Sequence, residues 1–312
     1  MSDTDDGLGF AAEHDVPIPY MQRTRDYYLA LGYGNPYRWA HYASVPFARL
    51  TRPLAQTRVA LVTTAAPYQS GKGDQGPGAP YNAAAKFYRV YSGDTAQIHD
   101  VRIAHVAYDR DHTSAADPNT WFPLPALRRA AAAGRIALAH RFHGLPTNRS
   151  QHTTLDQDCP DLLARLREDE AEAAILVPNC PVCHQSVSLA ARALEAAGIA
   201  TVVMGCAKDI VEHAGVPRFR FSDFPLGNSA GRPNDRDSQD RTLDLALDVL
   251  HSAPAPRSTV QSPLRWSDSP DWKLDYANIA RLSPEEVARR RAEFDRQKAV
   301  AQDARTSPHA AE

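Results

Sequence analysis

Three strand-length apolar runs dominate the middle of the chain. They cover 59–64, 173–178 and 199–204, and their side chains are too continuously apolar to alternate between core and solvent. Such runs are typical of strands buried on both faces of a parallel sheet. Residues 186–197 have a helical pattern that ends at Gly198, which suits the left-handed end of a helix. The second and third runs with this helix therefore predict a parallel strand–helix–strand crossover.

Weaker patterns predict the elements around this unit. We expect further strands at 88–93, 101–107 and 136–139, and helices at 123–133, 158–170, 242–252 and 284–301. The Gly- and Pro-rich segment 67–80 is expected to be a loop, either on the surface or over an active site, and 219–240 is expected to be irregular. The fold class predicted is α/β, with a doubly wound, mostly parallel sheet or sheets flanked by helices.

The two ends of the chain differ from this core in composition. Residues 1–50 are rich in Tyr, Arg and Pro, and we expect an N-terminal arm that packs on the main body. Residues 51–252 form the predicted α/β core, for which two α/β halves are an alternative arrangement. Residues 253–312 form a C-terminal extension, whose polar helix is expected to be a peripheral arm or a dimer contact in a homo-oligomer. The final ten residues are expected to be disordered.

Charge and cysteine content narrow the class of protein. The 312 residues contain 35 Lys and Arg against 37 Asp and Glu, so a net charge of −2 provides no positive field for nucleic acid. No apolar run reaches the roughly 18 residues of a membrane span, and the acidic start does not resemble a signal peptide. Cys159, Cys180, Cys183 and Cys206 are too few for a disulfide scaffold. We therefore expect a cytoplasmic protein that binds neither nucleic acid nor membrane.

Two of the four cysteines form a Cys-Pro-Val-Cys motif between a predicted strand and a helix. Pro181 suits the first helical position, which places Cys180 in the N-cap region. Unpaired N–H groups and the positive helix end stabilise a thiolate there, so Cys180 is the candidate nucleophile. Cys183 lies one turn later, where it can attack a mixed species on Cys180 and form a disulfide. His184 is a candidate local acid or base, unless it points into solvent or core.

Other interpretations of this motif stay open. A zinc site needs about four ligands, and the sequence offers no second Cys-x-x-Cys pair or His-x-His pair. The motif can also be two ordinary buried cysteines, as Cys159 and Cys206 are expected to be. A thioredoxin fold fits less well, because the predicted unit continues into a parallel strand and the chain is too long.

A second polar cluster follows the predicted strand 101–107. It consists of His105, Tyr108, Asp109, His112, Asp117 and Asn119. Because the carboxyl ends of parallel strands share one edge of a sheet, we expect this cluster to lie near Cys180. Asp109 and His112 are suited to bind a substrate ammonium, to transfer protons to a leaving amine, or to ligate a metal. Turn formation is the alternative explanation. His140 and His143 are weaker candidates of the same kind.

Taken together, these segments resemble a known selenoprotein family. The matching stretches are 108–112 with Asp117 and Asn119, 122–124, 177–186, 216–219 and 223–228, within a span of about 87–252. The chain resembles the glycine/sarcosine/betaine reductase component B and D-proline reductase family, and within it most closely the selenocysteine subunits of D-proline reductases.

The resemblance implies a chemistry for the cysteine motif. In that family a selenocysteine in a U-x-x-C arrangement cleaves a C–N bond reductively and is regenerated through a selenide–sulfide with the neighbouring cysteine. Cys180 stands at the selenocysteine position and Cys183 at the resolving thiol. Asn179, Asp223 and Asn228 lie in the matching segments and are expected to bind substrate. The family enzymes use a pyruvoyl-bearing partner, which this chain does not supply.

The sequence therefore predicts an oxidoreductase whose Cys180 and Cys183 dithiol cleaves a C–N or related bond in a small amine- or sulfur-bearing substrate. No resident cofactor and no metal are expected, and an external thiol or dithiol is the expected reductant. The expected partners are a thiol reductase or a second reductase subunit. Two alternatives are a cofactor-free isomerase like the Asp/Glu racemases, with Cys206 as the second thiol, and a non-catalytic, metal-binding subunit of a reductase complex.

Overall fold

The computed structural model describes residues 16–34 and 37–306, and the remaining residues are left out of the description. The predicted tail falls mostly on residues 307–312, which lie outside the described ranges. Residues 303–306, also predicted to be disordered, are helical instead.

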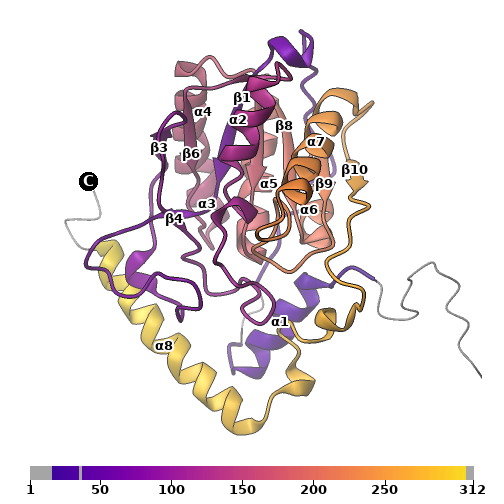
Figure 1. Ribbon diagram of the computed structural model, residues 1–312. Coiled ribbons are helices and arrows are strands. Elements are labelled where there is room, and N and C mark those ends of the chain that lie inside the picture. The colour runs from indigo at the N-terminus through magenta and orange to yellow at the C-terminus, as the bar shows by residue number, and fades with distance from the viewer. Residues whose placement is uncertain (1–15, 35–36, 307–312) are drawn as a thin grey trace, which may run out of the picture.

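A mostly parallel sheet forms the centre of the molecule, as predicted (Figure 1). Its strand order is β10-β9-β8-β7-β1-β6-β3, with the short β5 also paired to β1. The strands are β1 (Arg58–Thr63), β3 (Tyr91–Asp94), β5 (Ala137–Leu138), β6 (Arg141–Gly144), β7 (Ala173–Val177), β8 (Ala200–Gly205), β9 (Arg218–Phe221) and β10 (Ser258–Gln261). Among the described strands of this sheet, only β3, at the edge, pairs in antiparallel orientation.

Helices cover both faces of this sheet. They are α2 (Leu124–Ala132) and α7 (Arg236–Ser252) on one face, and α4 (Cys159–Glu168), α5 (Pro181–Ala196) and α6 (Lys208–Ala214) on the other. The faces alternate along β1: Val59 and Leu61 share one core with α2 and α7, whereas Ala60 and Val62 share the other with α4 and α5. Each buried Val or Leu stabilises the fold by about 1.5–3 kcal/mol. A strand covered on both sides has no need of polar alternation, which explains the continuous apolar runs.

The winding of the chain creates a crevice at one point of the sheet edge. From β1 the chain passes through α2 on one face to β6, and then returns through α4 on the opposite face to β7. β1 and β7 are parallel neighbours, with Leu61 opposite Ile175. Their connections leave toward opposite faces, so the carboxyl ends of β1 and β7 flank the switch point where ligands bind in doubly wound sheets.

Two predicted segments differ from the structure. The strand expected at 101–107 is confined to β4 (Val101–Arg102), which pairs with β2 (Ala66–Pro67) outside the main sheet, and the rest is a loop. The irregular region expected at 219–240 instead contains most of β9 and the start of α7. β9 alternates Arg with Phe, and both arginines are buried. Arg218 donates to Glu195 and to the Ala48 carbonyl, which come from other parts of the chain, so local sequence did not identify a buried strand.

The bounds of the helices also shift. α5 begins at Pro181, the first helical position expected from the Cys-Pro-Val-Cys motif, and so extends the helical pattern recognised from 186 by five residues. α7 begins at Arg236 rather than at 242. The expected helix ends are confirmed at Gly134 and Gly198, whose φ angles are +71° and +90°. The described helices also include the single turn α3 (Gln151–Thr153), and none of them combines the length and apolar character that a membrane span needs.

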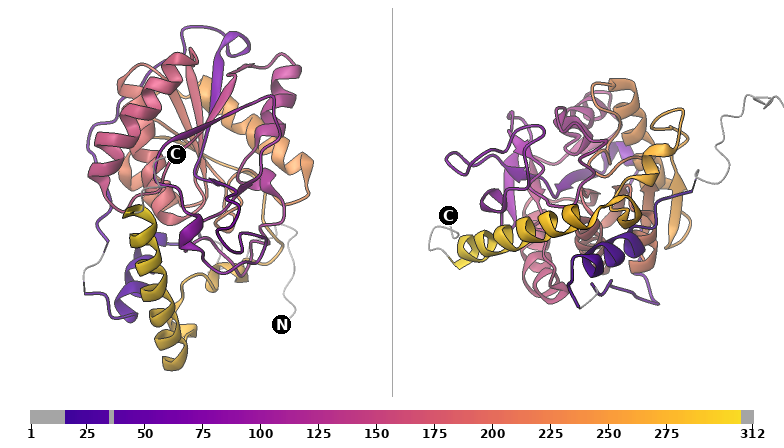
Figure 2. Two further views of the ribbon diagram at one scale, coloured as in Figure 1. Left: turned by 90° about the vertical axis from the view of Figure 1, so that its left-hand side faces the viewer. Right: turned by 90° about the horizontal axis from the view of Figure 1, so that it is seen from below.

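The arm and the extension meet below the sheet. α1 (Tyr20–Ala30) and α8 (Pro284–Thr306) lie side by side there (Figures 1 and 2). Phe294 stacks edge-on against Tyr28 and Tyr33, with ring centroids 5.4 Å and 5.2 Å apart. The Tyr33 hydroxyl donates to Asp295 at 2.6 Å. Two segments far apart in sequence therefore form one layer over the carboxyl edge.

Candidate functional site

The cysteine motif lies at the start of α5, beside the switch point. Cys180 is the N-cap residue, with φ −136° and ψ 170°, and its Sγ accepts a hydrogen bond from the Cys183 N–H at 3.2 Å. The two cysteines form a disulfide, and their Cα atoms are 4.9 Å apart. Thr147 donates its hydroxyl to Cys183 Sγ at 3.3 Å. An N–H donor and a helix N-terminus are both features that stabilise a thiolate.

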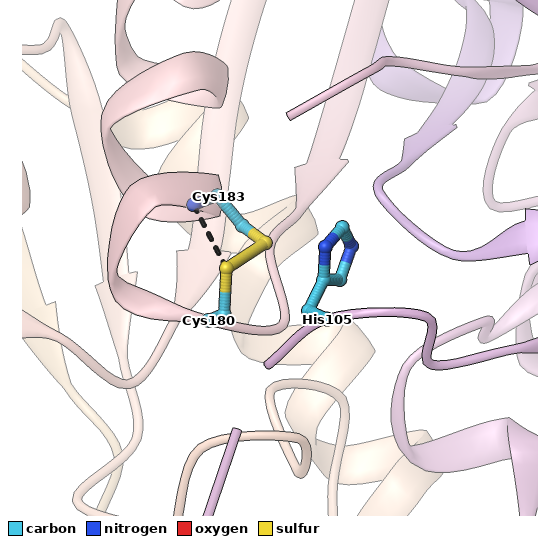
Figure 3. A group of neighbouring side chains, drawn as sticks. All are labelled: His105, Cys180 and Cys183. Atoms are coloured by element: carbon cyan, nitrogen blue, oxygen red, sulfur yellow. Dashed lines mark hydrogen bonds between the residues drawn. A yellow bond between two sulfur atoms is a disulfide. The ribbon is translucent and has the colours of Figure 1, made fainter. Parts of the chain in front are cut away.

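His105 lies against this cysteine pair, as Figure 3 shows. One of its ring nitrogens and the two Sγ atoms all lie within 4.8 Å of one another. Its Nε2 is 2.7 Å from the carbonyl oxygen of Thr64. A carbonyl only accepts, so Nε2 carries the proton and Nδ1 keeps a free lone pair. Burial lowers the pKa of His105 to about 4, so the imidazole is neutral near pH 7.

His184 holds the motif in place from behind. Its Nε2 accepts hydrogen bonds from the backbone N–H groups of Cys206 and Ala207, at 2.9 Å and 3.1 Å. Its Nδ1 therefore donates to the Cys180 carbonyl, at 2.8 Å. Burial lowers the pKa of His184 to about 4. Since both ring nitrogens bind backbone, the structure gives this side chain a positioning role.

Gly205 leaves the space that His184 occupies. A Cβ at position 205 would lie 2.7 Å from His184 Nε2 and 3.1 Å from Pro178 Cγ. Real Cβ atoms essentially never approach another atom to 2.7 Å, so a side chain at the end of β8 would displace the His184 ring. The orientation of the Cys180 carbonyl thus depends on a glycine in the neighbouring strand.

A cavity of about 830 Å³ opens in front of Cys180. That volume is typical of a small-molecule site. The walls come from α1, the segments 81–89, 104–107 and 147–157, the first turn of α5, and α8. Tyr28, Tyr37, Tyr81 and Tyr88 supply aromatic surface. Thr24 also lines the cavity, and its buried hydroxyl has no hydrogen-bond partner in the described structure. The site is therefore assembled from the arm, the core and the extension.

The charged groups around the cavity are all basic. Lys86, Arg89, Arg149 and Lys298 line it, and none of the described lining residues is Asp or Glu. The Arg149 guanidinium lies over the rings of Tyr28 and Tyr37, 5.6 Å and 5.8 Å from their centroids. Sequence reasoning missed these basic residues, and the Tyr-rich composition of the arm was a signal only for Tyr28 and Tyr37. Such a cavity favours a ligand with a negative charge.

Asp109 and His112 form a separate ion pair outside the cavity lining. The Asp109 carboxylate accepts from the backbone N–H groups of Asp111 and His112, each at 3.1 Å. The hydrogen bond from His112 Nδ1 to Asp109, at 3.2 Å, raises the pKa of His112. His112 Nε2 lies 3.2 Å from Asp275. The structure thus places this pair where it ties the 108–113 loop to the C-terminal extension.

Other polar residues singled out from the sequence lie in the surrounding structure. Asp117 caps the turn 118–120 and accepts from the Gln239 side chain at 2.7 Å. Asn119 donates its backbone N–H to Asp117 at 3.0 Å. Asn228 donates to Thr113 Oγ1 at 2.7 Å. Asp223 forms an ion pair with Lys273. None of these four expected substrate-binding residues lines the described cavity.

Two further expected site residues lie closer to the core. Tyr108 lies under the Arg110 guanidinium, whose carbon is 4.2 Å from its ring centroid. Asn179 precedes Cys180 and is fully buried, and neither polar atom of its side-chain amide has a partner in the described structure.

The two weaker histidine candidates lie near the sheet edge. His143 contacts Asp169 at 2.9 Å and Ser92 at 2.9 Å. His140 is exposed, 3.3 Å from Asp169.

The two remaining cysteines are buried thiols. Burial raises the pKa of Cys159 to about 12, and it raises the pKa of Cys206 to about 12 as well. Cys206 Sγ lies 3.7 Å from the Ser229 hydroxyl and is not among the residues that line the cavity. The racemase-like alternative needs a second thiol that faces Cys180 across a cleft, and the described structure does not provide one.

One curated protein shares most of its length with this chain. Over 220 residues the chain is 29% identical to the D-proline reductase subunit gamma of Acetoanaerobium sticklandii, a stretch that covers 70% of this chain and 88% of the relative. The chain is therefore similar to a subunit of a D-proline reductase. The resemblance drawn from the Cys-Pro-Val-Cys and Phe-Pro-Leu-Gly-Asn segments is thereby confirmed. No protein-family model and no solved structure matches the chain.

Proposed function

We propose that this D-proline reductase relative is a dithiol-dependent reductase. Cys180 acts as the nucleophile and Cys183 as the resolving thiol, on a small amine- or sulfur-bearing substrate bound in the cavity. The observation that carries the proposal is the placement of an N-capping Cys180 at the wall of an 830 Å³ cavity, with Cys183 in bonding distance. The kinship to a reductase subunit supports the reaction class.

The proposed reaction conserves atoms and electrons. The Cys180 thiolate attacks the substrate carbon, a C–S bond forms, and the C–N or related bond breaks with its electron pair leaving on the departing group. The Cys183 thiolate then attacks Cys180 Sγ, the C–S bond breaks, and the released carbon takes a proton. The substrate gains two electrons and two protons, and the dithiol becomes the disulfide. An external thiol or dithiol returns the disulfide to the dithiol.

His105 is the candidate proton carrier for these steps. One of its ring nitrogens lies within 4.8 Å of both sulfurs, and its Nδ1 lone pair can accept the proton of a thiol. The same nitrogen can then deliver that proton to the leaving group or the released carbon. Asp109 and His112, which sequence reasoning put forward for this work, lie outside the cavity lining.

The charges of the cavity define the substrate further. Four basic side chains and no described carboxylate face it, so an anionic group such as a carboxylate is the feature that the cavity recognises. The nitrogen or sulfur to be cleaved would then lie toward Cys180. We propose that the reductant is a cytoplasmic thiol system and that a second reductase subunit works with this chain, in line with the subunit name of the relative.

Trapping experiments test the proposal. The reduced chain is incubated with D-proline and other small amine- or sulfur-bearing carboxylates, and turnover is followed by mass spectrometry as loss of substrate and formation of the reduced product. Cys180→Ser should abolish turnover, and Cys183→Ser should accumulate a substrate adduct on Cys180. Cys206→Ser is the matched control, because Cys206 is buried outside the cavity. An unchanged rate of product formation in Cys180→Ser would contradict the proposal.

A further inference from the structure

His105, Cys180 and Cys183 form a compact cluster of metal-ligating side chains. One nitrogen and two sulfurs lie within 4.8 Å of one another (Figure 3), and all three residues are buried. The sequence supplies only the two sulfurs as neighbours. His105 is 75 residues away along the chain, and the fold brings it to the motif through the loop after β4. The zinc interpretation lacked ligands in the sequence, but the fold brings together three. A zinc site with three protein ligands takes a water or substrate atom as its fourth ligand.

We propose that the reduced form of this cluster binds a thiophilic divalent cation, Zn²⁺, through His105 Nδ1, Cys180 Sγ and Cys183 Sγ. A site of one histidine and two cysteines with a fourth, open position is a known arrangement for zinc. The cavity in front of Cys180 supplies the space for a water or substrate atom at that fourth position.

The surroundings of the three ligands match what a metal site needs. A histidine ligand normally donates its second N–H to a backbone carbonyl or carboxylate, which fixes its tautomer. His105 does so to Thr64 at 2.7 Å, and Nδ1 remains available. Each sulfur also receives a hydrogen bond, from the Cys183 N–H to Cys180 and from the Thr147 hydroxyl to Cys183. These donors stabilise the negative charge that two metal-bound thiolates carry.

Oxidation state decides whether the site exists. In the disulfide both sulfurs are bonded to each other and cannot serve as thiolate ligands. An external dithiol gives two electrons and two protons to the disulfide and is itself oxidised, which leaves two thiols. Zn²⁺ then displaces the two thiol protons. The proposal thus describes a metal site that opens on reduction and closes on oxidation.

Metal binding also affects the reductase chemistry proposed for the same cysteines. A zinc-bound Cys180 cannot attack a carbon freely, so Zn²⁺ should inhibit turnover and protect Cys180 from alkylation. The measurement of binding needs no substrate, so it stands apart from the proposed reductase function. A chain that binds Zn²⁺ but shows no turnover when it is reduced and metal-free contradicts the reductase proposal. A chain that turns over without binding Zn²⁺ contradicts only the metal site.

The test uses the full chain. It is reduced with a phosphine, and the phosphine is then removed under anaerobic conditions. Zn²⁺ is titrated in competition with a chromophoric chelator, and Co²⁺ is used as a second probe that reports sulfur ligation by its charge-transfer absorption. We expect one Zn²⁺ per reduced chain and none bound at this site in the disulfide form. Cys180→Ser, Cys183→Ser and His105→Gln should each weaken binding at least ~10-fold. Cys206→Ser should bind as the wild type does.

Three results would overturn the metal site: absence of binding to the reduced chain, equal binding to the disulfide form, or full affinity in His105→Gln. Circular dichroism establishes that each variant is folded. If His105→Gln does not fold, the wild-type chain is modified with diethyl pyrocarbonate. Zn²⁺ should then slow the modification of His105 without affecting the exposed His152. Equal rates with and without Zn²⁺ would contradict a His105 ligand.

Discussion

Two buried histidines beside the cysteine motif differ through their hydrogen-bond partners. His105 donates to a carbonyl and keeps a free lone pair near the sulfurs. The lone pair of His184 instead accepts hydrogen bonds from two backbone N–H groups. The sequence placed His184 next to Cys183 and so suggested it as the local acid or base. Its real partners, at 206 and 207, follow a different strand. The shared sheet edge led us to expect the cluster from His105 to Asn119 near Cys180, but adjacency in sequence could not show that His105 is the histidine that faces the dithiol.

The same burial predicts how stability depends on pH. The pKa of His105 and that of His184 are about 4 in the folded chain because of burial, against about 6.5 in an unfolded chain. Between these values the unfolded chain binds more protons, so stability falls as pH decreases from 6.5 toward 4. From pH 7 to pH 5 we expect a loss of about 2 kcal/mol for each histidine.

Urea unfolding of the His184→Gln variant at pH 7 and pH 5 tests this expectation. The variant should lose less stability over that range than the wild type, whatever its absolute stability. His152→Gln, at a side chain that is 94% exposed, is the matched control and should keep the wild-type pH dependence. The same loss of stability in His184→Gln as in the wild type would contradict the assignment.

Among the elements, β9 shows why part of the sheet could not be predicted from sequence. Its alternating Arg and Phe residues have the pattern of a half-exposed strand, yet Arg218 is 2% exposed and Arg220 is 0% exposed. Arg218 is paired with Glu195 on α5, at 2.7 Å, and donates to the Ala48 carbonyl at 2.6 Å. These partners are distant in sequence. By contrast, β1, β7 and β8 are mostly apolar, and they were identified directly.

The ion pair also joins the arm to the core, which makes its removal costly. Glu195 accepts from the Arg218 guanidinium and from the backbone N–H groups of Ala48 and Thr201. Glu195→Gln leaves Arg218 buried without its counter-charge, so we expect a loss of about 3–5 kcal/mol in the free energy of unfolding. Glu170→Gln removes an exposed partner of Arg58 and should cost less than about 1 kcal/mol. Equal losses in the two variants, measured by chemical denaturation, would contradict this account.

α8 covers the cavity, and one substitution can weaken its packing against the arm. Phe294→Ala removes two edge-to-face ring contacts, each worth about 0.5–1.5 kcal/mol, with Tyr28 and Tyr33. We therefore expect iodoacetamide to alkylate Cys180 of the reduced chain about 10-fold faster. Val300→Ala, at a 40% exposed position of the same helix, is the control and should leave the rate unchanged. Peptide mass spectrometry measures both rates, and equal rates would show that α8 does not limit access.

At the scale of the whole molecule, charge is distributed unevenly. The chain carries a net charge of −2, yet every charged residue in the described cavity lining is basic. Composition could predict the absence of a general polyanion surface but not a local basic cavity. The strand–helix–strand unit and the dithiol at its switch point followed from local patterns. The cavity did not, because its walls come from segments between Thr24 and Gln302.

This local field predicts a charge preference in alkylation. Relative to free cysteine, reduced Cys180 should favour the anionic iodoacetate over neutral iodoacetamide, because the basic side chains concentrate anions in the cavity. Arg149→Met should lower that preference several-fold, and added salt should reduce it in the wild type. Arg167→Met, on the outer surface of α4, is the matched control. A preference that is insensitive to Arg149 would contradict a functional basic cavity.

The burial of the two sulfurs decides which reductant can restore the dithiol. Cys180 is 4% exposed and Cys183 is 0% exposed. Thiol–disulfide exchange requires the attacking sulfur to reach one of them directly. A small dithiol can enter through the cavity, whereas a folded protein reductant cannot bring its own cysteine there unless α1 and α8 move aside. The layer formed by the arm and the extension therefore determines which reductants can reach the disulfide, and it also controls the entry of substrate.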